Sequence, residues 1–343
     1  MKRFSAAGVV ALALAAGGLT ACGDDANTDA GNASGGGDGK AKAAKVAYVT
    51  YAYTDFVQAE EQGVKDVVGK AGGSVQVFNA NFDAQKLNTS CQDAVRSGRY
   101  NAILLGSVDS PTGVPCVTAA KAANIPVVTI EPPVGKNVDT TEIQVDGVVG
   151  AVTLASTPNA DNLVEVAKLA CEGLDPCEII AEVATPSDHF TNEAVKRVAA
   201  DVPGAKIVQK VAGQYDPSII AKVFPDALSA HPETDVFLAA ADSQALAVVP
   251  ALKKAGKFGK VRLTGNGGSR LGAKAVADGT MFATAGNWPR EMGNLAAEML
   301  TKAINGEKIE NPAIDAITMD EPRIVTKETV SQFKPEWGAE AKG

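Results

Sequence analysis

Residues 102–130 read AILLGSVDSPTGVPCVTAAKAANIPVVTI. Two short apolar runs, 102–105 and 126–130, flank a stretch of helical period at 111–123. A strand, a helix and a second strand in this order form the repeating unit of a parallel sheet that is covered by helices. The stretch therefore predicts an α/β fold, and the same alternation continues on both sides of it.

The first half of the chain repeats this unit and then pauses. Strands are predicted at 46–50 and 75–79, and helices at 56–70 and 83–96. Prolines at 132, 133 and 158 interrupt the alternation, and two strand-like runs lie among them at 142–145 and 148–154. The first half therefore predicts one open sheet.

The alternation resumes in the second half. Helices are predicted at 159–171, 192–200, 217–230, 243–255 and 269–278, and strands at 178–183, 206–212, 236–240 and 262–264. A strand at 282–284, a helix at 289–304 and strand-like pieces at 314–318 and 324–326 are too few for a third domain. We therefore predict two Rossmann-like, three-layer αβα lobes, each with a crevice at the carboxyl ends of its strands.

Composition narrows the classes of function. The chain has 343 residues, of which 45% are apolar and 21% charged, so it is globular and long enough for two domains. Its 32 Lys and Arg against 40 Asp and Glu give a formal charge of −8, and no basic run could follow a phosphate backbone, so nucleic acid is not an expected partner. With two histidines and no Cys-x2-Cys pair, we expect neither a metal site nor a cofactor.

Enzyme motifs are also missing from the sequence. It contains no Gly-x-Ser-x-Gly elbow and no Gly-x4-Gly-Lys-Ser/Thr loop. The run at 265–270 imitates a dinucleotide-binding loop, but Arg270 takes the place of its last glycine, and no acidic residue stands at the end of a second strand about 20 residues later. We therefore expect a protein that is not an enzyme.

The N-terminus predicts export. Two positive charges precede an apolar run at 4–19, and Leu19-Thr20-Ala21-Cys22 resembles a bacterial lipobox, which implies a signal peptide at 1–21 and lipidation of Cys22. A plain secretory signal is the alternative. Residues 22–44 contain no large apolar side chain and predict a flexible tether, although any export signal could leave such a segment. The expected location is extracytoplasmic, with a lipid anchor in the cell membrane.

Four cysteines remain after Cys22, and disulfides persist in exported proteins. Three pairings are available on paper. Cys171 and Cys177 flank a turn and are expected to form a local bridge, which leaves Cys91 and Cys116 to pair between two neighbouring helices. Small buried side chains without a bridge are the alternative.

The chain resembles the type I periplasmic binding proteins, of the ribose- and galactose-binding branch that serves ABC importers. The similarity runs from about 45 to about 326, and its most specific stretches are 45–50 followed by Phe56, 83–98, 102–105, 123–130, 231–237, 242–247 and 303–308. It implies a hinged pair of lobes that closes over a solute, a permease and an ATPase as partners, and a monomer.

The resemblance also implies how the chain divides. Lobe 1 would comprise 45–156 and 287–316, lobe 2 would comprise 157–286 and 317–335, and 336–343 would form a tail. The chain would then cross between the lobes near 156–159, 286–287 and 316. The helix at 289–304 would return to lobe 1.

Site residues follow from the resemblance and from the strand ends. In the first lobe, Phe56 matches an aromatic wall of the family, and Glu131 matches an acidic residue that accepts two sugar hydroxyl bonds. Phe56 could instead only pack at a helix start, and Asp109 or Ser110 could instead be an N-cap. The candidates of this lobe are Thr50, Thr54, Asp55, Phe56, Ser107, Asp109 and Glu131.

The second lobe departs from the family pattern at several positions. Asn192 stands near the place of an Arg, Asn287 replaces a hinge amide, and Asp242 could instead be the N-cap of the helix at 243. His189 and Phe190 could line the cleft or be exposed. The candidates of this lobe are Asn192, Tyr215, Asp242, Asn266, Asn287 and Trp288.

These departures bear on the solute. Pro132 stands where ribose-type proteins carry an Arg, so ribose itself is doubtful and an uncharged sugar or polyol is expected, with a cationic or nitrogenous solute as the next choice. The expected function is an extracytoplasmic solute-binding lipoprotein of an ABC importer. A receptor for a membrane signalling protein, or an exported α/β enzyme that acts on a sugar-like substrate, is the alternative.

Overall fold

The computed structural model describes residues 41–186 and 188–339. The predicted signal peptide, Cys22 and most of the predicted tether lie outside the described residues. None of the described helices is long and apolar enough to cross a membrane.

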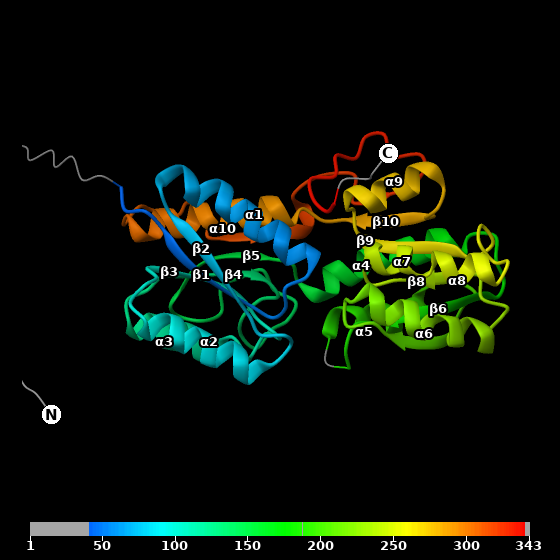
Figure 1. The fold of residues 1–343 in the computed structure, drawn as a ribbon, viewed down its shortest axis with the longest axis horizontal. Helices are drawn as coiled ribbons and strands as arrows, with labels where there is room; N and C mark the ends of the chain where they lie inside the picture. The colour runs from blue at the N-terminus through cyan, green and yellow to red at the C-terminus, as the bar shows by residue number, and fades with distance from the viewer. Residues whose placement is uncertain (1–40, 187, 340–343) are drawn as a thin grey trace, which may run out of the picture. The chain divides into compact units, whose positions relative to one another are not determined.

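The first sheet has six strands in the order β11-β5-β4-β3-β1-β2, and all of its neighbours run parallel (Figure 1). We call this sheet and its helices lobe 1. Its strands are β1 (Lys45–Thr50), β2 (Ser74–Asn79), β3 (Ala102–Gly106), β4 (Val127–Glu131), β5 (Val148–Thr153) and β11 (Ala313–Asp315).

Helices cover both faces of this sheet because successive side chains of a strand point to opposite faces. Tyr48 and Leu104 pack towards α1 (Asp55–Val68) and α10 (Pro289–Ile304). Ala47 and Leu105 pack towards α2 (Ala84–Arg96) and α3 (Val114–Ala122). The helix α10, distant in sequence, therefore belongs to lobe 1, as the resemblance implied.

The second sheet, with its helices, is lobe 2. Its order is β12-β10-β9-β8-β6-β7, with β12 antiparallel to β10 and the other neighbours parallel. Its strands are β6 (Cys177–Val183), β7 (Ala205–Ala212), β8 (Val236–Leu238), β9 (Arg262–Gly267), β10 (Ala283–Gly286) and β12 (Ile324–Val325).

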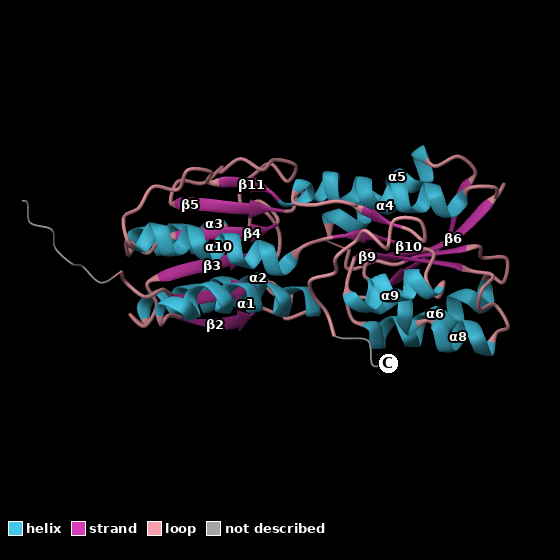
Figure 2. Ribbon diagram, turned by 90° about the horizontal axis from the view of Figure 1, so that it is seen from above, coloured by secondary structure: helices cyan, strands magenta, loops and turns pink. Residues whose placement is uncertain are grey.

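Lobe 2 repeats the three layers of lobe 1 (Figure 2). One face of its sheet carries α4 (Ser156–Cys171) and α5 (His189–Asp201). The other carries α6 (Pro217–Ala230), α7 (Asp242–Ala247), α8 (Val249–Lys254) and α9 (Arg270–Asp278). The predicted pair of αβα lobes is therefore confirmed, and the lobe boundaries drawn from the sequence stay predictions.

Three predicted elements were wrong in whole or in part. The strand-like piece predicted at 314–318 is a strand only as far as Asp315, and Ala316–Thr318 forms a 3-10 helix. Residues 142–145 form no strand, because the Gln144 side chain accepts hydrogen bonds from the backbone of Lys136 and Asn137 and holds this segment as a loop. The helix predicted over 243–255 is two helices that meet at Val248, and Pro250, which has no N–H to donate, lies in the first turn of the second.

Both expected disulfides are confirmed. Cys91 of α2 bonds to Cys116 of α3 across 5.6 Å between their Cα atoms. Cys171 at the end of α4 bonds to Cys177 at the start of β6 across 5.5 Å. Each bridge ties neighbouring elements within one lobe.

Candidate functional site

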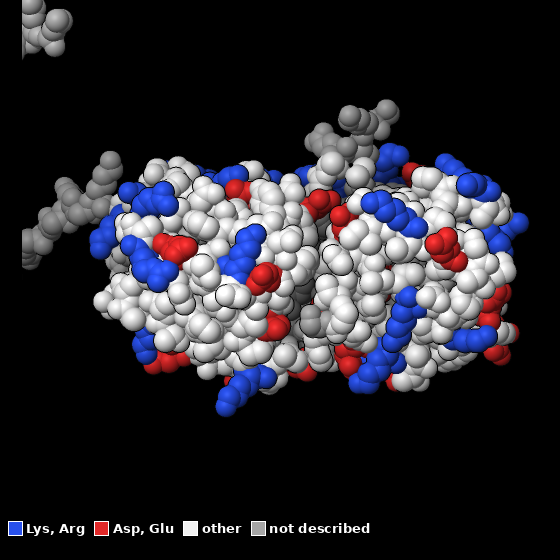
Figure 3. Space-filling model, turned by 60° about the horizontal axis from the view of Figure 1, so that its bottom comes forward, with Lys and Arg blue, Asp and Glu red and all other residues white. Residues whose placement is uncertain are grey.

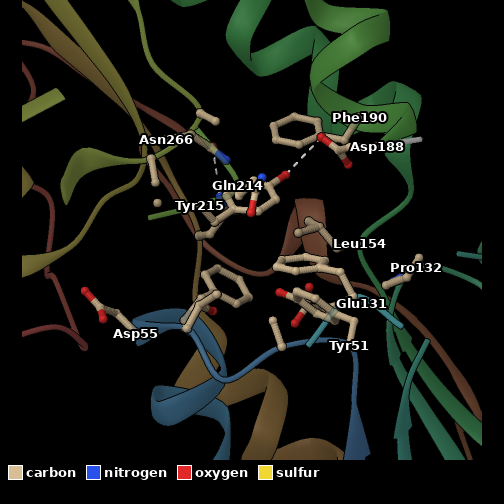
Figure 4. Close-up of a pocket in the computed structure, with 18 of the residues that line it drawn as sticks. Tyr51, Asp55, Glu131, Pro132, Leu154, Asp188, Phe190, Gln214, Tyr215 and Asn266 are labelled. Carbon is tan, nitrogen blue, oxygen red and sulfur yellow. Dashed lines mark hydrogen bonds between the residues drawn. The ribbon is translucent and has the colours of Figure 1, made fainter. Parts of the chain in front are cut away.

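The carboxyl ends of both sheets border one pocket of about 650 Å³. Loops that follow β1, β2 and β3, with the last residue of β4, supply it from lobe 1, and loops that follow the strands of lobe 2 supply the other side. Open α/β sheets place ligands at this edge, and small-molecule pockets have this size. Figure 4 shows side chains of the two lobes directed into the same space.

Backbone strain is concentrated at this pocket. Six residues other than glycine have a positive φ in the part of the chain that the structure describes, and all but Asn124 line the pocket. The five are Asn81, Phe82, Glu131, Gln214 and Tyr215. Because such conformations persist where a function needs them, the strain marks this pocket as the candidate site.

The floor of the lobe 1 side carries a pair of carboxyl groups. Glu131 ends β4, is 9% exposed, and its Oε1 has no hydrogen-bond partner. Glu60, on the buried face of α1, accepts a hydrogen bond from the Tyr48 hydroxyl, and its own Oε1 has no partner. Burial raises the pKa of Glu131 to about 7, while Glu60 and Tyr51 lower it by hydrogen bonding.

The pKa of Glu60 is raised well above its ordinary value, first by burial and then by the charge of Glu131. Two carboxyl groups in contact cannot both ionise easily in a buried place. Glu131 is therefore the carboxyl of the pair that ionises first as the pH rises.

Aromatic rings from both lobes line the pocket. Phe82 of lobe 1 stacks on Tyr215 of lobe 2 at 6.4 Å between ring centroids, and Tyr51 lies 5.7 Å from Phe82. Phe56, at the start of α1, meets the edge of Trp337 at 5.5 Å. Flat apolar surfaces therefore face a polar floor, an arrangement that suits a ring with hydroxyl groups at its edge.

The lobe 2 side is braced by hydrogen bonds. The Tyr215 hydroxyl donates to Asp188 at 3.1 Å, and Asp188 also accepts from the backbone of Thr191 (Figure 4). Burial raises the pKa of Asp188 above its ordinary value. Because its partners hold it, Asp188 serves first to orient Tyr215.

Two amides and one carboxyl complete this side. The Asn287 side chain donates to the Asn266 carbonyl at 3.0 Å, and both residues line the pocket. Asp242 accepts from the backbone and hydroxyl of Ser269 and from the Thr284 hydroxyl. It lies in the first turn of α7, whose N-cap is Ala241, so the N-cap alternative for Asp242 was wrong.

The structure brings most of the candidate residues together. Asp109 and His189 are both at the pocket, Asp109 accepting from the backbone of Thr112 rather than capping α3, whose N-cap is Gly113. The candidates that line the pocket are Thr54, Asp55, Phe56, Ser107, Asp109, Glu131, Tyr215, Asp242, Asn266 and Asn287.

Three candidates lie elsewhere. Thr50 is fully buried in β1, and its hydroxyl has no partner. Asn192 donates to the backbone of the loop before α5, at Thr185 and Asp188, and braces that loop. Trp288 packs in the core of lobe 2 against Phe333 and does not line the pocket.

Several lining residues were missed from the sequence. Asn81 and Phe82 follow β2, and Gln214 follows β7, so the rule that ligands bind at the carboxyl ends of strands could have found them. Trp337 was assigned to the tail, because no periodic pattern extends that far. Glu60 was missed because a lone Glu on a helix is usually exposed.

The described residues contain no group of three His, Cys, Asp or Glu side chains that could hold a metal ion. The titratable groups of the pocket instead engage hydroxyl, amide and backbone partners. The side chains that line the pocket can therefore accept hydrogen bonds from a ligand and donate hydrogen bonds to it.

Comparisons with known proteins agree with this fold and site. Residues 46–308 match the periplasmic binding protein domain family. The chain is 26% identical over 255 residues to the ribose import binding protein of Escherichia coli, which covers 74% of this chain and 82% of that protein. It is 23% identical over 230 residues to the D-apiose import binding protein of Actinobacillus succinogenes, with 67% and 72% covered.

Solved structures extend the likeness. An ABC transporter solute binding protein from Mycobacterium smegmatis with bound glycerol is 25% identical, has a TM-score of 0.71, and covers 87% of this chain and 100% of its own. One from Bacillus halodurans with bound myo-inositol shares the fold at a TM-score of 0.68 and 20% identity, with 86% and 98% covered. The chain therefore belongs to the periplasmic binding protein family, of type I, a family of binding proteins rather than enzymes.

Proposed function

We propose that this protein is the extracytoplasmic solute-binding protein of an ABC importer. It binds a small hydroxylated solute in the pocket between its lobes and delivers it to a membrane permease that works with an ATPase. A lipid on Cys22 anchors it to the cell membrane.

One observation carries the proposal: side chains from the carboxyl ends of two sheets line a single pocket, and five of them stand on strained backbone. Amides, hydroxyls and a buried carboxyl alternate there with aromatic rings, which suits a sugar or polyol. The import proteins among its relatives, and the glycerol and inositol in similar structures, support the same class of solute.

The first test is a thermal-shift screen with pentoses, hexoses and polyols, followed by calorimetry. A solute bound only by the folded state raises the melting temperature by mass action. We expect saturable binding without turnover. Conversion of the bound solute into a product would instead indicate an exported enzyme, and no shift with any member of the screen would contradict the proposal.

The second test concerns Glu131. Glu131→Ala removes the buried acceptor, and we expect the affinity for the identified solute to fall at least tenfold, because a hydrogen bond to a charged group contributes about 1.5–3 kcal/mol. Glu310→Ala is the control, since that carboxyl is exposed and pairs with Lys308. If both variants bound the solute with equal affinity, Glu131 would not be part of the binding site.

The anchor is tested with Cys22→Ser. A serine hydroxyl cannot form the thioether that carries the lipid, so the variant should leave the membrane fraction and fail to incorporate an alkyne-labelled fatty acid. A variant that stays in the membrane and is labelled would contradict the anchor without touching the solute site.

A further inference from the structure

Apart from His189, the charged side chains that line the pocket are all acidic. On the outer face shown in Figure 3, Lys and Arg stand among Asp and Glu. Among the described residues that line the pocket, none is Lys or Arg and six are acidic. These are Asp55, Asp109, Glu131, Asp188, Asp216 and Asp242.

Most of these carboxyl groups already have partners in the protein. Asp109, Asp188, Asp216 and Asp242 each accept a hydrogen bond from a backbone N–H of a nearby turn or helix start. Glu131 differs from them, because it is buried and its Oε1 is unpartnered. Asp55 is exposed at the start of α1, and Glu131 is the buried carboxyl of the pocket whose hydrogen-bonding partners, Glu60 and Tyr51, include no cation.

Its neighbours do not supply the missing positive charge. The groups that shift the pKa of Glu131 and of Glu60 are carboxyls and phenols, and no cation is among them. Since burial and the charge of Glu131 raise the pKa of Glu60 above that of Glu131, the negative charge of the pair forms first on Glu131, which lines the pocket. A buried negative charge that no positive charge offsets is unfavourable even when it accepts hydrogen bonds, so a ligand that brings a positive charge would relieve it.

The walls suit the same kind of ligand. The faces of aromatic rings attract ammonium groups through their quadrupole. Tyr51, Phe82 and Tyr215 form a connected set of rings in the pocket, and burial, followed by the charge of Glu131, raises the pKa of Tyr51 above its ordinary value. Rings also pack on the apolar faces of sugars, so the feature that favours an amine over a neutral sugar is the carboxyl of Glu131 with no cation beside it.

We propose that the solute of this protein is a hydroxylated amine, such as an amino sugar or an amino polyol, and that its protonated nitrogen binds at Glu131. This inference rests on the proposed function and names the class of solute within it. Hydroxyl groups of the same molecule would bind the amides of Asn266 and Asn287 on the opposite wall.

The test compares amines with the matching neutral compounds. D-glucosamine with D-glucose, D-galactosamine with D-galactose, and N-methyl-D-glucamine with D-glucitol differ mainly in one nitrogen. Titration calorimetry and thermal shift at pH 7.5 should find at least one amine that binds tenfold or more tightly than its neutral partner. N-acetyl-D-glucosamine, which carries no charge, should lose that advantage.

A charge-removing variant locates the nitrogen. Glu131→Gln keeps the size of the side chain, so it should weaken the bound amine at least tenfold and its neutral partner less than threefold, while Glu310→Gln changes neither. A neutral compound that binds as tightly as its amine overturns this inference and leaves the proposed function standing. An equal loss for amine and neutral compound in Glu131→Gln overturns the assignment to Glu131, and no stabilisation by any compound, charged or neutral, overturns both proposals.

Discussion

Single residues of the pocket sit on backbone that most side chains avoid. A left-handed conformation costs an ordinary residue about 1–2 kcal/mol, and Phe82, Glu131, Gln214 and Tyr215 all adopt it. The strain places their side chains at the pocket, where an extended backbone would have turned them elsewhere. The backbone therefore fixes the direction of these side chains before a solute binds.

Glu182, which is buried in lobe 2, makes the stability of the folded protein depend on pH. It is 2% exposed, it accepts from the backbone N–H of Ala240 at 3.0 Å, and it accepts from the Gln244 amide. Burial raises its pKa from the ordinary 4.5 to about 8. A carboxyl whose pKa is higher in the folded state holds its proton more tightly there, so its full contribution to stability is present below about pH 4.5 and is lost as the pH rises towards 8.

We predict that Glu182→Gln flattens this dependence. The glutamine can accept from Ala240 and donate to the Gln244 Oε1, which has no partner in the wild type. Between pH 5 and pH 8 the variant should lose less stability than the wild type, by a difference on the order of a few kcal/mol. Urea unfolding at several pH values measures it.

Burial also raises the pKa of other carboxyl groups, and these contribute to the pH dependence of the wild type and of Glu182→Gln alike. The test therefore compares the free energies of unfolding of the two proteins at each pH. Burial raises the pKa of Asp242 to about 6, and it titrates in both proteins alike. Parallel curves for the wild type and Glu182→Gln would show that Glu182 is ionised in the folded protein.

At the scale of elements, lobe 1 depends on a close crossing of α1 and α10. A Cβ added at Gly63 would lie 2.0 Å from the carbonyl oxygen of Arg290, and one at Gly293 would lie 2.1 Å from that of Glu60. The two helices meet backbone to backbone at these glycines. This crossing holds α10 on lobe 1, and Glu60 lies on α1 at the crossing.

We predict that Gly63→Ala destabilises the protein by about 2 kcal/mol or more, because the helices must separate to admit the methyl group. Gly69→Ala is the matched control: it lies near the end of the same helix at φ −62°, and nothing is within 4 Å of the added Cβ. There alanine should be neutral or stabilise by about 0.4–1 kcal/mol. Equal effects of the two substitutions in urea unfolding would contradict a close crossing.

The elements themselves could largely be predicted from the sequence, because apolar strands and helical periods leave local patterns. Most predicted strands and helices appear within a few residues of the expected ends. Residues 142–145 failed because a side chain, Gln144, supplies the hydrogen bonds that a strand would have taken. The site was harder to predict. The positive φ of Glu131, the burial of Glu60 and the position of Trp337 at the pocket all arise from contacts between distant parts of the chain.

At the scale of the two lobes, the C-terminal segment joins them. Trp337 donates its indole N–H to the Gly267 carbonyl of lobe 2 at 2.8 Å. The neighbouring Glu336 accepts from the backbone N–H groups of Arg290 and Glu291 at the start of α10, in lobe 1. Trp337 is thus bound to lobe 2 while its ring edge meets Phe56 of lobe 1.

The two tryptophans of the chain therefore stand in different surroundings. Trp337 borders the pocket and touches both lobes, whereas Trp288 packs against Phe333 in the core of lobe 2. If solute binding closes a hinge, the environment of Trp337 changes and that of Trp288 does not. We predict that Trp337→Phe abolishes most of the change in intrinsic fluorescence on solute binding, and that Trp288→Phe keeps it. Calorimetry on both variants must show that the solute still saturates them. A fluorescence change that survives in Trp337→Phe and disappears in Trp288→Phe would mean that solute binding changes the core of lobe 2 rather than the contact between the lobes.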